Sequence, residues 1–472
     1  MAGGISGLGL GWRRELAGDL LASPRLVDFV EIIAESCYAP GPQRREAQAI
    51  SSIWKVIPHG IKLSLGSADG VDLDRARQLG ELARLTRAPM VSEHATFTRS
   101  RGQEIGHLTQ LPLSRAAVAV VARNLAKVRR VLPDVPFLLE TPAWTLRWPE
   151  DEMDEGAFFH EIVGATGCDL LLDLSNVYSN ALNSGCDPLA LLRRYPLERV
   201  AMVHLAGGSW RDDFYVDTHA HPTPPAAFEL LAELLRITGP VPVLIERDGN
   251  YPPFAELRGE LQQARSLVEA APARPRPAPP PPAAAQAATA SELQALAQRQ
   301  AQLTSLLTGT EAPGAALCRP FDHAAIARSR SILHHKRAEE ALALLPRLKC
   351  PGSGELYKLA LLCVGQTGRA PAFTAVADAL RIAAAAAAQW PALASAARLE
   401  LLQLRARFTT SQGHPSVRWA PFLGSVSHAD GSRTWAFKPP GRFARVRLRT
   451  SRLESPPHSV LGPVPENLEK AT

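Results

Sequence analysis

Nine side chains that can bind metal ions stand at the ends of short apolar runs or in the loops beside them. Glu140 ends the run PFLLE, Asp173 ends DLLLD and Glu246 ends VPVLIE, while His204 stands near the end of VAMVHL. Each of these groups is a polar side chain placed where an apolar strand would stop. The complete set is His59, His94, Glu140, Asp173, Asn176, His204, Asp217, His219 and Glu246.

Only the whole set of nine residues, and not any single member, indicates a metal site. A single Asp or Glu at a strand end is more often a helix cap or an ion-pair partner, and a single His in an apolar run is more often a satisfied core residue. Many such groups at successive strand ends are harder to explain in that way, because apolar residues would avoid the cost of burying charge. Imidazoles and carboxylates without cysteine suit iron, manganese or zinc, so the pattern predicts a site for more than one metal ion.

The elements that must position these groups alternate between strands and helices. Apolar runs of strand length are separated by longer helical stretches such as Asp72–Arg87 and Leu113–Val131. Repeated strand–helix units build parallel sheets, and in a closed barrel the carboxyl ends of the strands meet at one mouth. The pattern therefore predicts an α/β fold, a (β/α)8 TIM barrel with one strand not recognised, and a doubly wound open sheet is the alternative. The predicted strands are Leu26–Ile33, Ile61–Leu65 (which His59 would precede), Met90–Ser92 (which His94 would follow), Pro136–Glu140, Leu170–Asp173, Val200–Leu205 and Pro242–Glu246.

A proline-rich segment divides the chain into modules. It reads PARPRPAPPPPAAAQAATA, a composition typical of an extended spacer without a core of its own. Behind it, Ser291–Leu307, Ile326–Leu348 and Pro371–Arg407 have helical patterns, and Phe443–Thr450 alternates apolar and basic residues like an edge strand. The predicted domains are a catalytic barrel over 1–271, the linker over 272–290, a mostly helical basic domain over 291–450 and a disordered tail over 451–472.

Charge is distributed unevenly between these modules. Residues 1–271 hold 27 Lys and Arg against 34 Asp and Glu, a net charge of −7, whereas the rest of the chain holds 25 against 12, a net charge of +13. This asymmetry predicts different partners for the two parts of the chain.

No secretory signal and no apolar run of about eighteen residues occur, and the six cysteines are scattered. We therefore expect a cytoplasmic protein that does not contact a membrane.

Six motifs occur in an order that resembles one enzyme family. They read VSEHATFT, LLETP, LLLDLSNVY, VHLAGG, VDTHAHP and LIERDGNYPP, and the similarity covers roughly residues 5 to 268. The chain resembles the multinuclear non-heme iron-dependent oxidative enzymes, long catalogued as a domain of unknown function. The resemblance implies a xylose-isomerase-like barrel that holds two or three iron ions in mixed Fe(II)/Fe(III) states. It also implies O₂-dependent oxidation of cysteine residues in a ribosomally synthesised peptide, as in methanobactin biosynthesis.

By motif, the resemblance also implies how the ligands are divided. His59, His94, Glu140 and Glu246 would hold the first iron, and the two glutamates would bridge to a second iron held with Asp173 and His204. Asn176, Asp217 and His219 would form a third, more labile site. His221 is kept in reserve because it lies close in sequence to the D-T-H triplet of residues 217–219, not because of the resemblance. Two segments depart from the family pattern. Ile33 and Ser36 stand in EIIAES where relatives commonly have His and Asn, and Gly208 stands where a larger residue is common.

Other functions remain open at this point. Sugar isomerases and phosphodiesterases like endonuclease IV also gather His, Asp and Glu at a barrel mouth, and a non-catalytic metal-binding scaffold would need the same ligands.

The expected partner is a cysteine-containing precursor peptide, presented by a separate recognition protein or by residues 291–450. That module weakly resembles C-terminal domains that accompany such barrels, and its positive charge suits an acidic leader. A solvated basic face is the alternative. Nucleic-acid binding is disfavoured because the basic residues are not grouped around aromatic ones.

Overall fold

The computed structural model describes residues 5–274, 288–309, 320–348, 354–370, 373–411, 414–428, 431–442 and 444–450. The chain divides into two compact units. Most of the predicted linker over 272–290 and all of the predicted tail over 451–472 lie outside the described residues, so the domain boundaries stay a prediction. The first unit comprises Met1–Gln302 with Ala316–Asp322, and the second comprises Leu303–Ala315 with His323–Thr472.

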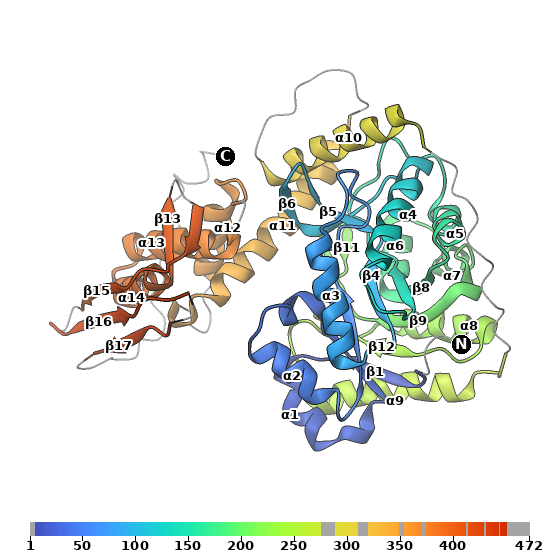
Figure 1. The fold of residues 1–472 in the computed structure, drawn as a ribbon, viewed down its shortest axis with the longest axis horizontal. Coiled ribbons are helices and arrows are strands. Elements are labelled where there is room, and N and C mark those ends of the chain that lie inside the picture. The colour runs from blue at the N-terminus through green and yellow to red at the C-terminus, as the bar shows by residue number, and fades with distance from the viewer. Residues whose placement is uncertain are drawn as a thin grey trace. The chain divides into compact units, whose positions relative to one another are not determined.

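Eight parallel strands of the first unit close into a barrel in the order β1-β12-β9-β8-β7-β4-β3-β2 (Figure 1). The closure confirms the predicted (β/α)8 architecture and rules out the open doubly wound sheet. Long apolar runs such as DLLLD suit these strands because each is covered on both faces, by the barrel interior and by the helices outside. The barrel strands are β1 (Leu8–Gly11), β2 (Phe29–Ile33), β3 (Lys55–Gly60), β4 (Val91–His94), β7 (Phe137–Glu140), β8 (Asp169–Asp173), β9 (Val200–Leu205) and β12 (Val243–Ile245).

Helices cover the outside of the barrel, and two short antiparallel hairpins project from its loops. The hairpins are β5 (Thr96–Ser100) with β6 (Gln103–Gln110), and β10 (Ser209–Arg211) with β11 (Phe214–Val216). Both follow barrel strands that carry site residues, so they belong to the mouth of the barrel. The helices are α1 (Arg14–Ala22), α2 (Pro42–Ile50), α3 (Leu73–Thr86), α4 (Arg115–Arg129), α5 (Glu155–Thr166), α6 (Leu174–Ser184), α7 (Pro188–Leu192), α8 (Pro225–Thr238) and α9 (Phe254–Ala270).

The structure differs from the sequence-based expectation at two strands, for identifiable reasons. The unrecognised strand is β1, whose sequence LGLG has low strand propensity. Its Gly9 is required because a Cβ there would lie 2.3 Å from the ring of Phe29 on β2. The predicted strand Ile61–Leu65 is wrong: β3 ends at Gly60 and contains His59. Pro58 within β3 reads as a strand breaker, yet it pairs in register with Ile32 of β2.

The barrel interior below the mouth is filled by a layer of apolar side chains. Six of the barrel strands contribute to it, namely β2, β3, β7, β8, β9 and β12, together with Met90 directly before β4, as expected when strands alternate inward and outward positions. These side chains are almost fully inaccessible to solvent, so they form a solid floor below the polar groups at the strand ends. The layer comprises Phe29, Ile57, Met90, Leu138, Leu171, Ala201, Met202 and Leu244.

The second unit combines helices with short antiparallel strands. The predicted helical stretch Pro371–Arg407 is two helices, α13 (Thr374–Gln389) and α14 (Pro391–Arg407), separated at Trp390 because Pro391 begins a new helix. Helix α12 (Gly354–Gly365) was not predicted. The other helices are α10 (Ala290–Thr308), which crosses the division between the units, and α11 (His323–Ala343). None of the described helices is long and apolar enough to cross a membrane.

Two small sheets follow α14. Strands β13 (Phe408–Ser411) and β14 (His414–Val417) form one, and β15 (Phe422–Ser427), β16 (Arg433–Lys438) and β17 (Arg447–Arg449) form the other in that order. Strand β17 lies at an edge, as the alternating apolar and basic pattern of Phe443–Thr450 predicts. The strands between residues 408 and 438 were not predicted.

We expect Leu171→Ala in the barrel interior to lower the free energy of unfolding by about 2–5 kcal/mol, because it removes buried methyl groups and leaves a cavity. Denaturant unfolding of the purified variant measures this change. Leu21→Ala on α1, where the leucine is 50% exposed, is the matched control and should change stability by less than about 1 kcal/mol. Equal losses in both variants would contradict the packing role of Leu171.

Candidate metal centre

The strand ends bring the predicted site residues to one place. His59 lies on β3, His94 and Glu140 end β4 and β7, and Asp173 and His204 lie on β8 and β9. Register pairing puts His94 opposite Glu140 and Asp173 opposite His204, so these side chains lie at the same level of the barrel. Glu246 follows β12 directly, Asn176 lies in the first turn of α6, and Asp217 and His219 follow β11.

His59, His94 and Glu140 form the first of three groups whose donor atoms lie close enough to hold one ion. Glu140 Oε2 lies 3.1 Å from His59 Nε2 and 3.1 Å from His94 Nε2. The opposite ring nitrogens are held by the scaffold, His59 Nδ1 by Ser92 Oγ at 2.8 Å and His94 Nδ1 by the carbonyl oxygen of Gly60 at 3.3 Å. Each ring therefore turns the same nitrogen, Nε2, toward Glu140.

Glu140, Asp173 and His204 form the second group, which shares Glu140 with the first. His204 presents Nδ1, which lies 3.4 Å from Glu140 Oε1 and 3.3 Å from Glu246 Oε2. Its Nε2 is held instead by Glu31 Oε2 at 3.2 Å. Asp173 Oδ1 accepts the backbone N–H groups of Ser175 and Asn176 as the cap of α6, which leaves Oδ2 facing the site.

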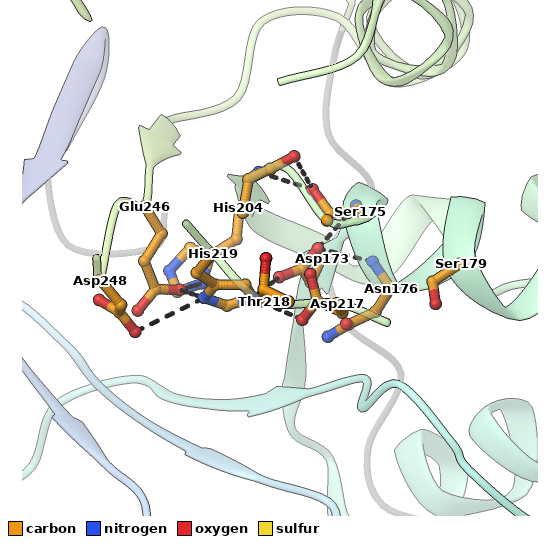
Figure 2. Close-up of polar contacts among 12 residues, drawn as sticks. Asp173, Ser175, Asn176, Ser179, His204, Asp217, Thr218, His219, Glu246 and Asp248 are labelled. Atoms are coloured by element: carbon orange, nitrogen blue, oxygen red, sulfur yellow. Dashed lines mark hydrogen bonds and ion pairs between the residues drawn. The ribbon is translucent and has the colours of Figure 1, made fainter. Parts of the chain in front are cut away.

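Asp173, His219 and Glu246 form the third group, which Figure 2 shows together with Asp217. His219 Nδ1 lies 3.2 Å from Glu246 Oε2, and His219 Nε2 lies 2.6 Å from Asp217 Oδ2 and 4.0 Å from Asp173 Oδ2. His219 has a φ of 53°, a left-handed backbone conformation that costs a non-glycine residue free energy and is typical of functional sites. Glu246 is thus grouped with Asp173 and His219 rather than with His59 and His94.

Asn176 lies beside the third group (Figure 2). Its Nδ2 donates a hydrogen bond of 3.0 Å to the carbonyl oxygen of Thr141, while its Oδ1 has no hydrogen-bond partner. His221, the reserve residue, contacts Thr218 Oγ1 at 2.8 Å through Nδ1 and belongs to none of the three groups. The structure therefore brings the nine predicted residues to one mouth, eight of them joined by ion-pair contacts.

Burial and opposite charge together set the protonation of the site. Burial opposes the charged form of His94, but Glu140 and Glu93 raise its pKa to about 9. Burial also opposes the charged form of Glu140, whose pKa is held at about 2 by His94 and His59. Burial raises the pKa of Asp173 to about 7, and the neighbouring charge of Asp217 adds to this rise. All three pKa shifts arise because ionisable groups are buried within ion-pair distance of one another.

Six buried donor and acceptor atoms of the site form no hydrogen bond among the described residues, and four of them, Glu140 Oε2, Asp173 Oδ2, His204 Nδ1 and His219 Nε2, lie within ion-pair distance of other ligands only. Buried polar atoms are almost always paired, because an unpaired one costs roughly 1–3 kcal/mol. Six such atoms in one pocket fit ligands that are aimed at ions. The donor set of imidazole, carboxylate and amide oxygen without cysteine suits iron, manganese or zinc. The six atoms are Glu140 Oε2, Asp173 Oδ2, Asn176 Oδ1, His204 Nδ1, Asp217 Oδ1 and His219 Nε2.

Sequence reasoning missed residues that hold the ligands in place. Glu31 of β2 contacts His204, and Arg13 after β1 donates to Asp248 and, at 3.2 Å, to Glu246 Oε1. Glu31 was passed over because it lies within the predicted strand Leu26–Ile33 rather than at its end, where the other ligand-type residues were sought. Arg13 was missed because β1 itself was not recognised.

Gly208, one of the departures from the family pattern, has a structural explanation. A Cβ at Gly208 would lie 2.4 Å from the carbonyl oxygen of Val216 and 2.7 Å from the ring of Tyr215. The backbone N–H of Gly208 donates a 3.0 Å hydrogen bond to the Tyr215 hydroxyl. The β10–β11 hairpin therefore fills the space that a larger side chain would need.

Comparison with known proteins identifies relatives of the barrel. The family model for "RiPP precursor modification enzyme MbnB/TglH/ChrH" matches residues 7–269. A UPF0276 protein of Streptomyces avermitilis is 39% identical over 57% of this chain, and the chain spans only 57% of that relative's length. A UPF0276 protein of Rhizorhabdus wittichii is 39% identical over 56% of this chain and 95% of its own.

Solved structures are similar to the chain at low sequence identity. Endonuclease IV from Thermus thermophilus is 19% identical with a TM-score of 0.38, over 56% of this chain and 98% of its own. A xylose isomerase domain protein from Planctomyces limnophilus is 15% identical with a TM-score of 0.38, over the same shares. The family match covers more than half of the chain and includes every strand of the barrel. The chain therefore belongs to the family of MbnB/TglH/ChrH-type RiPP precursor modification enzymes.

Proposed function

We propose that this protein uses two or three iron ions and O₂ to oxidise cysteine residues of a ribosomally synthesised precursor peptide. The observation that carries the proposal is the set of three overlapping ligand groups, which share Glu140 and Asp173 and four of whose buried atoms form no hydrogen bond among the described residues. Shared carboxylates are the ligands that bridge neighbouring ions, so this geometry favours a multinuclear centre over a single ion. Family membership supports the precursor peptide as the partner.

His59, His94 and Glu140 would hold the first ion, and Glu140, Asp173 and His204 the second. A third ion would lie among Asp173, His219 and Glu246, with Asn176 and Asp217 beside it. When bound, iron supplies the redox chemistry, by which electrons pass from a cysteine thiolate to O₂ as the terminal acceptor. The protein's own groups do the rest: they fix the ions, orient the cysteine and keep bulk water out.

The second unit would serve peptide recognition within the same chain. The chain behind the barrel, residues 272–472, carries a net charge of +13, which complements the acidic leader expected of the precursor. The experiments on the metal centre below do not depend on this role.

Metal content tests the redox class of the enzyme. We expect purified protein to contain about two or three iron ions per chain and to develop a visible charge-transfer band when a thiol peptide is added without O₂. Elemental analysis and absorption spectroscopy measure both properties. Peptide modification supported by zinc or magnesium alone would contradict the proposal and favour a hydrolase or isomerase.

The ligand assignment predicts loss of activity from single substitutions. We expect His94→Ala and Glu246→Ala to abolish the mass shift of a co-expressed cysteine-rich precursor peptide, because each removes a donor from a different ligand group. Elemental analysis should show less bound iron in both variants. His160→Ala, which removes an exposed histidine from α5, is the matched control and should retain the mass shift. Full modification by both ligand variants would refute their assignment.

Glu31 is expected to position His204 rather than to bind an ion. Glu31→Leu removes the acceptor of His204 Nε2 and should weaken binding of the second ion by roughly 10- to 100-fold. Glu31→Gln keeps an acceptor oxygen and should restore most of the affinity. Metal titration measures both, with the exposed Glu15→Leu on α1 as control. Unchanged affinity in Glu31→Leu, with folding intact by circular dichroism, would exclude the positioning role.

A further inference from the structure

The β15–β16–β17 sheet of the second unit has one covered face and one open face. Ala436 of β16 is fully buried and packs in one cluster with Leu399 and Leu402 of α14. Residues of β16 alternate strictly between exposed and buried positions, as expected for a strand with a single covered face. The side chains that complete the covered face are Phe422, Val426, Val446 and Leu448.

The open face exposes large apolar side chains. Trp435 and Phe437 of β16 are 45% and 47% exposed, and Leu423 of β15 is 69% exposed. Leu423 pairs directly with Phe437 across the strands, so the three residues form one patch rather than scattered exceptions. Contiguous apolar patches on a protein surface mark interaction sites more often than single exposed residues do.

Arginines border this patch on β17 and at the start of β16. Arg447 and Arg449 of β17 are exposed and pair across the strands with Phe437 and Trp435. Arg433 lies over the ring of Trp435 at 5.6 Å. The sequences of the three strands contain no Asp or Glu, and none of these arginines forms an ion pair within the described part of the chain. We call this surface the arginine–aromatic face; it comprises Leu423, Arg433, Trp435, Phe437, Arg447 and Arg449.

The edge of the sheet beside these arginines is open. Strand β17 pairs with β16, and no other described strand pairs with its outer edge. An open edge offers backbone N–H and C=O groups to an additional strand, which is a common way for proteins to bind extended peptides. Here the edge that pairs with no other described strand belongs to β17, the strand that also carries Arg447 and Arg449.

We propose that the arginine–aromatic face and the outer edge of β17 bind an extended acidic segment of the precursor peptide. Alternate residues of an extended chain lie about 7 Å apart on one side, so acidic residues at every second position can meet Arg447 and Arg449 in turn. Apolar side chains of the same segment then pack on Trp435 and Phe437. This inference rests on the proposed function for the identity of the partner and adds the surface that selects it.

Single-stranded nucleic acid is the competing occupant. The expectation that basic residues are not grouped around aromatic ones is wrong for this sheet, and exposed rings flanked by arginines also suit stacked bases. The observations favour a peptide because the outer edge of β17, which pairs with no other described strand, offers backbone N–H and C=O groups that an added strand can match and a nucleic acid cannot. The β15 border does not separate the two occupants, because Arg433 Nε donates a 3.2 Å hydrogen bond to Ser427 Oγ there.

Fluorescence anisotropy of the full chain with a labelled peptide tests the proposal. The probe is a peptide of about twelve residues in which glutamate alternates with leucine and serine, long enough to span the sheet. Arg447→Glu with Arg449→Glu should weaken binding at least about tenfold, and Trp435→Ala about fivefold. The matched control, Arg398→Glu with Arg405→Glu on exposed positions of α14, makes the same charge change and should alter affinity less than about twofold.

Three outcomes would overturn the proposal. These are no binding of the peptide by wild-type protein, equal weakening by the control variant, and tighter binding of an oligothymidylate of matching charge that the same face variants abolish. Circular dichroism checks that each variant is folded. All measurements use the full chain as purified, and elemental analysis of the face variants should show unchanged metal content. Failure of peptide binding and failure of the iron assignment are therefore read out separately.

Discussion

The burial of many ionisable groups in one pocket is the constraint on which the barrel depends. Glu140, Asp173 and His204 are almost completely inaccessible to solvent, and one atom of each forms no hydrogen bond among the described residues but lies within 4.0 Å of another ionisable ligand. A pocket of this kind is costly to fold, because charges removed from water need partners at close range. The imidazoles supply part of that compensation, as the depressed pKa of Glu140 indicates. Ions held among the three ligand groups would supply the remainder, and would link metal binding to stability.

The residues around the site hold its buried charged side chains in fixed positions. Below the polar groups lies the apolar layer that includes Leu138 and Leu171, which leaves little room for the side chains above it to relax. Each of the three buried histidine rings has one nitrogen held by the scaffold and the other turned toward Glu140. The scaffold partners of His59, His94 and His204 are Ser92, the carbonyl oxygen of Gly60 and Glu31, respectively. The rings are therefore oriented before any ion arrives, which reduces the entropy lost on binding.

The sequence predicts the barrel and its polar mouth because both depend on local patterns. Short apolar runs that end in a ligand-type residue, such as the one before Asp173, specify strand and site together. Strand β1 escapes this reasoning because Gly9 is demanded by the ring of Phe29, a contact between different strands that no local pattern records. Glu31 was overlooked for a different reason: its role is visible only once His204, far away in the sequence, lies beside it. The grouping of ligands around particular ions is likewise a property of three-dimensional arrangement.

Asp173 joins two duties in a single side chain. One carboxylate oxygen caps α6 by accepting the N–H groups of Ser175 and Asn176, while the other points into the ligand cluster. Any shift of this carboxylate toward an ion would therefore pull on the first turn of the helix, which carries Asn176. An ion bound by Asp173 would in this way change the position of Asn176, a donor beside the third ligand group. Binding of one ion can therefore affect the binding of the next.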